Sequence, residues 1–198
     1  MQENEASPSL TREVSDAAWG LIALLRHRED WSLGFDPTAR GFVRSFIAPA
    51  LALPFYLMTS AMIARATHVT GAGPLWADGL SDVMDALAYP LVVAAFARPL
   101  KLGGGFTAFI VTINWASLFI NLLLAASSVA LMFGREGAAV FSTATLILFA
   151  LSIFITWRAA RSALTEELAP ALLMVVLSVA VGVLCDQAGR DLVRLLAL

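Results

Sequence analysis

Five long apolar stretches, separated by short polar connections, dominate the pattern of residues along the chain. A helix that crosses a hydrocarbon layer of ~30 Å needs about 20 mainly apolar residues at ~1.5 Å per residue. Stretches that meet or approach this length lie at residues 45–64, 80–100, 106–133, 138–157 and 168–185. The last helix either ends near residue 185 or runs on to the carboxyl end as an amphipathic interfacial segment. The pattern therefore predicts an all-α fold, an integral membrane bundle of about five transmembrane helices over residues 45–198.

The second and third stretches depart from a simple crossing. Residues 80–100 hold Asp82 and Asp85 near their start, which leaves a short uncharged centre. We therefore expect a short or tilted helix that begins about a turn below the membrane interface. Residues 106–133 carry no charge and exceed the length of one perpendicular crossing, so tilt is expected there too.

An amphipathic pattern precedes the first apolar stretch. Its apolar positions are Val14, Ala17, Ala18, Leu21, Ile22 and Leu25, with charged residues on the other side. We expect residues 1–10 to be a disordered lead, and residues 11–44 to form a cytoplasmic amphipathic helix and an interfacial link. Such a helix either binds a membrane surface or a partner, or packs under the protein's own loops, and we favour the packing interpretation because such helices are common in membrane proteins.

The composition agrees with a lipid medium and excludes several classes of protein. Of the 198 residues, 59% are hydrophobic and 14% are charged, against about 25% charged in soluble domains, so a soluble globule is excluded. The single Cys185 and the separated His27 and His68 argue against a disulfide scaffold and a metal cluster. The net charge of −2 and the lack of a polybasic tract argue against nucleic acid binding, and no cofactor is expected.

Basic residues in the connections predict the orientation. An amino terminus in the cytoplasm places nine basic residues inside and four outside. The inner set is Arg12, Arg26, Arg28, Arg40, Arg44, Arg98, Lys101, Arg158 and Arg161, and the outer set is Arg65, Arg135, Arg190 and Arg194. The positive-inside rule then predicts a cytoplasmic amino terminus and a periplasmic carboxyl terminus.

Targeting and source follow from two further features. The first long apolar run starts only at Ser45, so we expect no cleavable signal peptide, and insertion directed by the first span. Lys101 is the only lysine beside twelve arginines, and alanine is abundant, a bias typical of GC-rich bacterial genes. We therefore expect a multi-pass protein of a bacterial inner membrane.

Polar residues form stripes on the third and fourth predicted helices. Those of the third helix are Asn114, Ser117, Asn121 and Ser128, and those of the fourth are Ser142, Thr145, Ser152 and Thr156. We expect the two stripes to meet. They form either a helix-packing seam, which we favour, or a polar path between the two helices.

An acidic row lies at the outer end of the second predicted helix. Asp78, Asp82 and Asp85 follow a spacing of four and three, so they share one face, and Asp186 of the fifth stretch belongs to the same outer layer. The row would either hold a cation or be neutralised by Arg65 or Arg135, and we favour an Asp85–Arg65 pair because an unpaired buried carboxylate is costly. No carboxylate is expected near the middle of the bilayer, which speaks against an ion-coupled transporter.

The layout of five spans, a cytoplasmic amphipathic amino-terminal region and a short outer carboxyl end resembles that of Yip1-like membrane proteins. The resemblance covers residues 11–198, and the segment GFDPTARGFVRSFIAPALALP, residues 34–54, is similar to the entry into their first span. The resemblance implies a role in membrane organisation, as for eukaryotic members of that family.

We expect a non-enzymatic protein, because no nucleophile and base, and no pair of carboxylates, fall at a common depth. The first hypothesis is an accessory, assembly or scaffold subunit that contacts lipid and other membrane subunits or itself through the amphipathic helix and the long third helix. The alternative is a small oligomeric transporter or channel subunit with a polar path between the third and fourth helices.

Overall fold

The computed structural model describes residues 9–67, 74–97, 99–100, 102 and 104–196. The regular structure of these residues is entirely helical, which confirms that the fold is all-α. The elements are α1 (Leu10–Leu25), the 3₁₀ helix η1 (Glu29–Gly34), α2 (Ala39–Ser45), α3 (Ile47–Thr67), α4 (Leu75–Ala97), α5 (Phe106–Ser128), the 3₁₀ helix η2 (Val129–Phe133), α6 (Gly134–Ala163) and α7 (Leu168–Leu196). Most of the predicted disordered lead, and the basic residues Arg98 and Lys101, lie outside the described residues.

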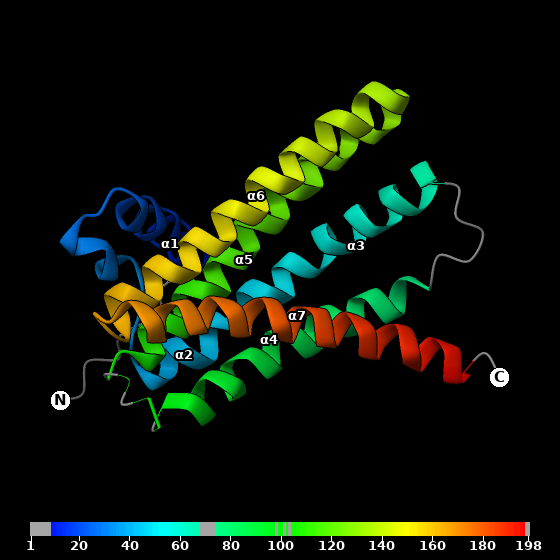
Figure 1. The fold of residues 1–198 in the computed structure, drawn as a ribbon. Coiled ribbons are helices and arrows are strands. Elements are labelled where there is room, and N and C mark those ends of the chain that lie inside the picture. The colour runs from blue at the N-terminus through cyan, green and yellow to red at the C-terminus, as the bar shows by residue number, and fades with distance from the viewer. Residues whose placement is uncertain (1–8, 68–73, 98, 101, 103, 197–198) are drawn as a thin grey trace.

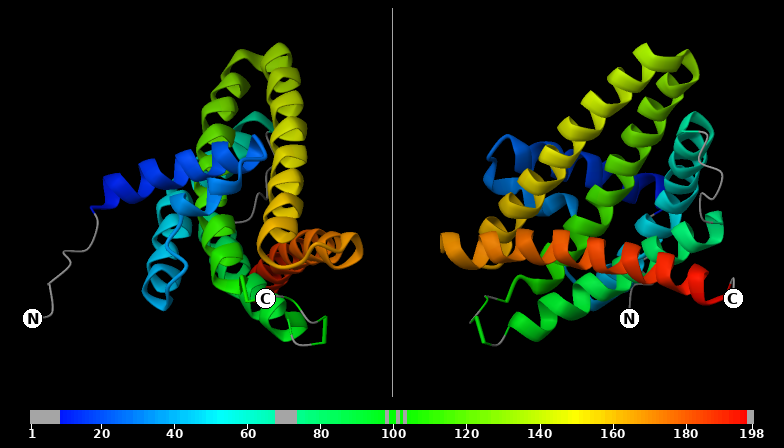
Figure 2. Two further views of the ribbon diagram at one scale, coloured as in Figure 1. Left: turned by 90° about the vertical axis from the view of Figure 1, so that its left-hand side faces the viewer. Right: turned by 45° about the vertical axis from the view of Figure 1, so that its right-hand side comes forward.

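Within the described residues, four helical stretches are long and apolar enough to cross a membrane, which fits a multi-pass membrane protein. They are Ala39–Thr67, Leu75–Ala97, Phe106–Ala163 and Leu168–Leu196. The third and fourth predicted spans both lie within the single 58-residue stretch Phe106–Ala163. That stretch reverses direction near Gly134, which has a φ of +66°, so α5 and α6 lie side by side as a hairpin (Figures 1 and 2).

The helices run between two ends of the bundle. α1, η1 and α2 lie at one end, called here the amino-terminal end, and the α5–α6 turn and the end of α7 lie at the opposite end, called the far end (Figure 1). α3 packs against α5, and α4 packs against α7. The α5–α6 hairpin and the α4–α7 pair diverge toward the far end (Figure 1, and the right-hand view of Figure 2).

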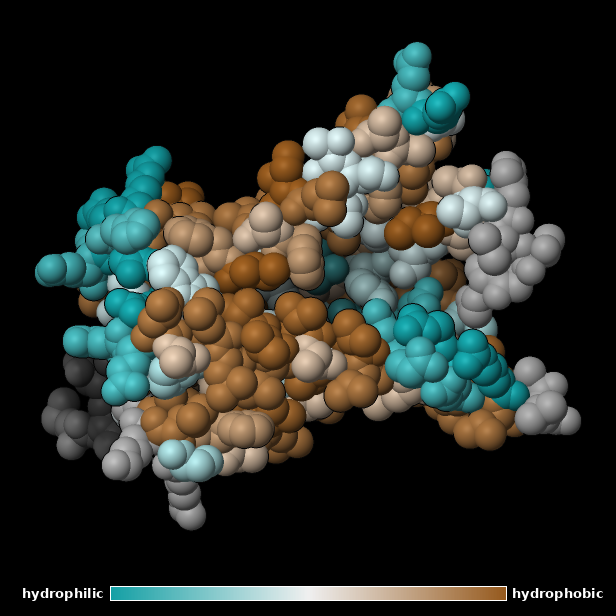
Figure 3. Space-filling view, in the orientation of Figure 1, coloured by the Kyte–Doolittle hydropathy of each residue, from teal (hydrophilic) through white to brown (hydrophobic). Residues whose placement is uncertain are grey.

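Burial is concentrated where the helices converge. Phe109, Ile110 and Val111 in the first half of α5 are almost completely buried. By contrast, the outer faces of α6 and α7 expose large apolar side chains, with Leu146 69% and Leu184 67% exposed. Figure 3 shows hydrophobic residues over the middle of the molecule and hydrophilic residues gathered toward its ends. Apolar side chains of this size belong in lipid, because water would penalise their exposure.

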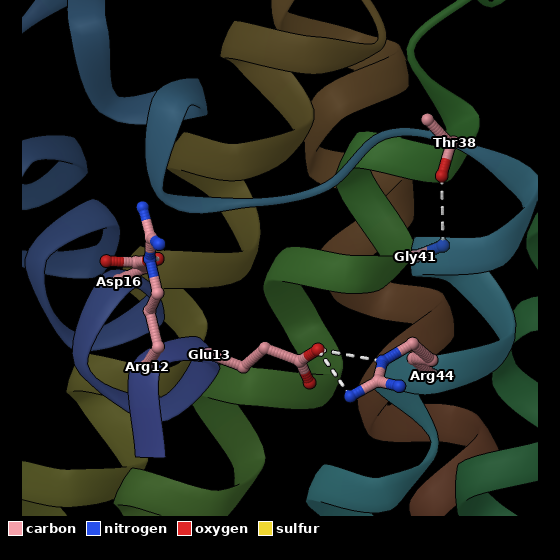
Figure 4. A network of polar contacts seen from close by, with 6 residues as sticks. All are labelled: Arg12, Glu13, Asp16, Thr38, Gly41 and Arg44. Atoms are coloured by element: carbon pink, nitrogen blue, oxygen red, sulfur yellow. Dashed lines mark hydrogen bonds and ion pairs between the residues drawn. The ribbon is translucent and has the colours of Figure 1, made fainter. Parts of the chain in front are cut away.

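Close backbone packing and an ion pair between α1 and α2 hold the amino-terminal end together. A Cβ at Gly34 of η1 would lie 2.5 Å from a backbone oxygen of α1, so only glycine fits there. Arg44 Nη2 of α2 lies 2.6 Å from Glu13 Oε1 of α1 (Figure 4). The Thr38 hydroxyl accepts a 3.1 Å hydrogen bond from the Gly41 N–H and so caps α2.

The amphipathic helix α1 buries its apolar side against other helices of the protein. Ala17, Leu21 and Leu24 are buried, and α1 contacts η1, α5 and α6. Trp19 and Ile22 remain exposed at 39% and 49%. This arrangement is the one expected if α1 packs under the bundle.

Candidate functional site

Asp85 lies near the middle of α4. The helix begins at Leu75 rather than near residue 80, and Asp85 is the eleventh of its 23 residues. At ~1.5 Å per residue, the carboxylate is roughly 15 Å along the helix from Leu75, about half of a hydrocarbon layer. The sequence pattern predicts a helix that begins near residue 80 with Asp85 close to its start, because it takes the polar first turns of α4 for a connection.

A small pocket of about 110 Å³ between α3, α4 and α5 surrounds this carboxylate, and we call it the polar pocket. α4 contributes Asp82, Asp85, Tyr89 and further residues, and α5 contributes Asn114, Ser117 and Asn121 with Ile113. Spacings of three and four place each set on one face of its helix. Two stripes that are separate in the sequence thus meet across the pocket.

Hydrogen bonds orient the amides of the polar pocket. Asn114 Nδ2 donates to Ser45 Oγ at 2.8 Å, and Ser45 Oγ in turn donates to the Phe42 carbonyl at 2.7 Å. Asn121 Nδ2 donates to the Ser117 carbonyl at 3.0 Å. Among the described residues neither amide oxygen accepts a hydrogen bond, so both remain available to a ligand.

One oxygen of Asp85 is buried without a partner. Oδ1 accepts no hydrogen bond in the structure. A Cβ built at Gly182 of α7 would lie 3.8 Å from this oxygen, so Asp85 lies between the polar pocket and α7. Within the part of the chain that the structure describes, no basic side chain forms an ion pair with Asp85. A buried carboxylate in this state needs a compensating charge or proton.

The predicted Asp85–Arg65 pair is not formed. Arg65 lies in the last turns of α3 and is exposed, and it lines a different cavity together with Arg135. Asp85 lies more than two turns of α4 away from that end. The prediction failed because it placed both residues at the same depth.

Two further hollows lie along α7, and neither is lined by Asp85 itself. One, of about 380 Å³ between α3, α4 and α7, is lined by Tyr56, Asp78, Ser81, Asp186, Arg190 and Arg194 among others. The other, of about 290 Å³ between α6 and α7, is lined by Ser152, Ser178, Gly182 and Asp186 among others. We call these two hollows and the polar pocket together the acidic crevice. Four carboxylates line it, at positions 78, 82, 85 and 186.

The charge along the acidic crevice changes with depth. At its mouth Arg190 Nη2 donates to Gln187 Oε1 at 3.1 Å, and Arg194 Nη1 lies 3.0 Å from Asp191 Oδ1. The lining that the structure describes around Asp85 contains no basic residue. A positively charged ligand would therefore be attracted most strongly to the inner part.

The polar stripe of α6 lies apart from that of α5. Ser142 is exposed, and Ser152, Thr145 and Thr156 donate to carbonyls of their own helix. Ser152 faces the groove toward α7, and no hydrogen bond joins the two stripes among the described residues. Ser128 is buried and donates to the Ala125 carbonyl at 2.7 Å. Helical periodicity predicted that the residues of each stripe share one face of their helix, but it did not predict which helix packs against that face.

Sequence reasoning missed Tyr89 and Gly182. Tyr89 is buried, and its hydroxyl donates to the Met174 carbonyl of α7 at 3.0 Å, which fixes α4 against α7. Its spacing of four from Asp85 was the available signal. Gly182 matters only through its neighbour on another helix, which no local pattern reveals.

The chemistry of the crevice is that of oxygen ligands. Its inner part offers carboxylate, amide and hydroxyl oxygens, which suit hard cations. The described residues contain no group of three or more histidine, cysteine, aspartate or glutamate side chains close enough to hold a metal ion. The arrangement fits a singly charged cation held by one principal carboxylate better than a chelated divalent metal.

Comparisons with known proteins return no relative. No family model matches the chain, and neither does any curated protein or solved structure.

Proposed function

We propose that this protein is a non-enzymatic transport subunit of a membrane that binds a small monovalent cation in its acidic crevice, with Asp85 as the principal ligand. One observation carries the proposal: the unpartnered, buried Oδ1 of Asp85 lies near the middle of a spanning helix. Intramembrane carboxylates are costly and commonly mark ion pathways. The amide oxygens of Asn114 and Asn121 supply the neutral part of the ligand shell.

The proposed route follows one face of α4. Asp78, Asp82 and Asp85 are spaced at four and three, so they lead from the far end to the middle of the helix. From Asp85 the amide stripe of α5 continues toward Ser45 at the amino-terminal end. The crevice opens between diverging helices, and a second copy of the chain would close it to lipid, which supports a homo-oligomer.

We propose five crossings, with the amino terminus in the cytoplasm and the carboxyl terminus outside. The hairpin of α5 and α6 supports this count, because 23 and 30 residues are each long enough for one crossing. The basic residues of the connections support the orientation, and the arginine and alanine bias supports a bacterial inner membrane. We also propose a Yip1-like layout, since it has the same number and order of segments.

The second candidate function is that of an accessory or assembly subunit. It is favoured by the apolar side chains that α1 and η1 leave exposed, which are Trp19, Ile22 and Leu33, the last 78% exposed. Such residues would contact the membrane surface or another subunit. A stoichiometric foreign subunit recovered in mild detergent would favour this function.

Cation flux into liposomes tests the transport proposal. We expect reconstituted wild-type protein to pass Na⁺ or K⁺, and Asp85→Asn to abolish most of this flux, because the amide keeps the shape but removes the charge. Asp191→Asn is the matched control, since Asp191 is exposed and pairs with Arg194 outside the inner crevice. Equal flux through wild type and Asp85→Asn would contradict the proposal.

A double variant distinguishes a cation path lined by the asparagine amides from a helix-packing seam. Asn114→Leu with Asn121→Leu removes the amide oxygens. If the double variant remains folded and loses flux, the amides are ligands. If it only lowers the stability of the fold, the stripe is a packing seam.

A further inference from the structure

A second cavity at the far end is basic and is separate from the acidic crevice. It measures about 580 Å³ and lies between the last turns of α3 and the turn from α5 to α6. Its lining includes Arg65, Arg135, Met62, Leu131 and Met132, none of which lines the crevice.

The two arginines of this cavity have no acidic partner among the described residues. Two other exposed arginines, Arg28 and Arg194, each pair with an aspartate. Glu136 follows Arg135 in the sequence but does not line the cavity. A guanidinium presents a planar set of donors that matches a phosphate, and two of them in one cavity favour a dianionic or bridging oxyanion.

The start of α6 adds to the positive potential of the cavity. The 30-residue helix begins at Gly134, which lines the cavity, and no side chain caps its first amides. Free N–H groups and the positive end of the helix dipole attract anions. The helix end only supplements the arginines, which carry the charge.

The cavity also has an apolar side. Met62, Leu131 and Met132 line it, and Met132 is 73% exposed. The adjoining Phe133 is 76% exposed. Because α3 and α5 are apolar enough to span a membrane and end here, we expect the arginines to lie at the depth of lipid headgroups.

We propose that this cavity binds the phosphate of an anionic phospholipid, with Arg65 and Arg135 on the phosphate and the methionines against an acyl chain. The shared chemistry is phosphate recognition, and inorganic phosphate is the other source of the same group. The apolar lining favours the lipid. The proposal is independent of cation transport.

Lipid retention by the purified full chain tests the site. The probes are phosphatidylglycerol in phosphatidylcholine nanodiscs and, in a separate arm, inorganic phosphate, with bound ligand measured by native mass spectrometry. We expect the Arg65→Gln, Arg135→Gln double variant to bind phosphatidylglycerol at least about tenfold more weakly than wild type, because it loses two charge-assisted contacts. The control is Arg190→Gln with Arg194→Gln, which removes the same charge from the same end.

Each outcome decides the proposal. Weaker binding in the cavity variant with much less change in the control supports it. Equal weakening in both variants would overturn it, since general attraction to anionic lipid would then explain the binding. Arginine-dependent binding of inorganic phosphate without binding of phosphatidylglycerol would overturn the lipid as occupant. Because both arginines are exposed, thermal unfolding should be the same in all variants, and a lower melting temperature in the cavity variant alone would indicate a structural role and also overturn the proposal.

Discussion

The contact between α4 and α7 at Gly189 yields a prediction whose size follows from the structure. A Cβ at Gly189 would overlap Ser81 Oγ and lie 3.2 Å from the Ala77 carbonyl oxygen. The Ser81 hydroxyl is held in place by a 3.0 Å hydrogen bond to that same carbonyl. Gly189→Ala therefore forces the helices apart, and overpacking of this kind costs about 1–3 kcal/mol.

The partner substitution makes the reasoning specific. Ser81→Ala removes the overlapping atom and leaves the new methyl 3.4 Å from the Ser81 Cβ, a contact that small shifts can relieve. The lost hydroxyl contributes little, about 0.6 kcal/mol for a typical hydrogen bond within a membrane. We therefore expect the double variant to recover about 1–2 kcal/mol relative to Gly189→Ala alone.

Reversible unfolding in mixed micelles measures these free energies. The fraction of denaturing detergent is raised while tryptophan fluorescence is followed, and the double-mutant cycle is completed with Ser81→Ala. If Gly189→Ala is as stable as wild type, or if Ser81→Ala fails to rescue it, α4 and α7 do not approach each other this closely at Gly189.

Two further predictions concern the groove beside Asp85 and the amino-terminal end. We expect Gly182→Leu to fill the space beside Asp85 Oδ1 and to reduce cation flux. Gly182→Ala should leave the flux nearly unchanged, because its Cβ would lie 3.8 Å from that oxygen. Equal flux through both variants would contradict a role for this groove. The Arg28 guanidinium donates a 2.6 Å hydrogen bond to the Asp30 carboxylate and lowers the pKa of Asp30. The pair therefore stabilises the folded state at pH values above the pKa that Asp30 has in the unfolded chain. This stabilisation is lost as the pH falls through the lower pKa of the folded state. Titration followed by NMR should show the Asp30 pKa rising to its ordinary value in Arg28→Gln, and an unchanged pKa would show that the pair does not form in solution.

The hydrophobic pattern predicted the helices better than their ends. It started the second span near residue 80, whereas α4 begins at Leu75. It ended the fifth span at residue 185 and left open that the helix runs on, and α7 does continue to Leu196. In both places the segment between the predicted and the observed helix end contains polar residues. Hydropathy treats Asp78 and Asp186 as markers of a helix end, but side chains like these remain inside a helix when they face a polar hollow between neighbours.

The candidate site was predicted as separate faces. Helical spacing placed Asp82 with Asp85 and Asn114 with Asn121, and each set does lie on one side of its helix. The expectation that the amides would meet the hydroxyls of α6 had no basis in spacing, since a periodicity of 3.6 residues says which residues share a face and nothing about the helix opposite. The structure pairs the amide face with the carboxylates of α4.

The amino-acid sequence by itself determined that this chain belongs in lipid and that it is helical, because long uncharged runs leave the backbone no other way to satisfy its hydrogen bonds in hydrocarbon. Only the tertiary structure decided the depth of Asp85, its lack of a basic partner and its position between α5 and α7. Depth and partnership depend on how helices pack against one another. Those contacts are made between residues far apart in the chain, so no local pattern contains them.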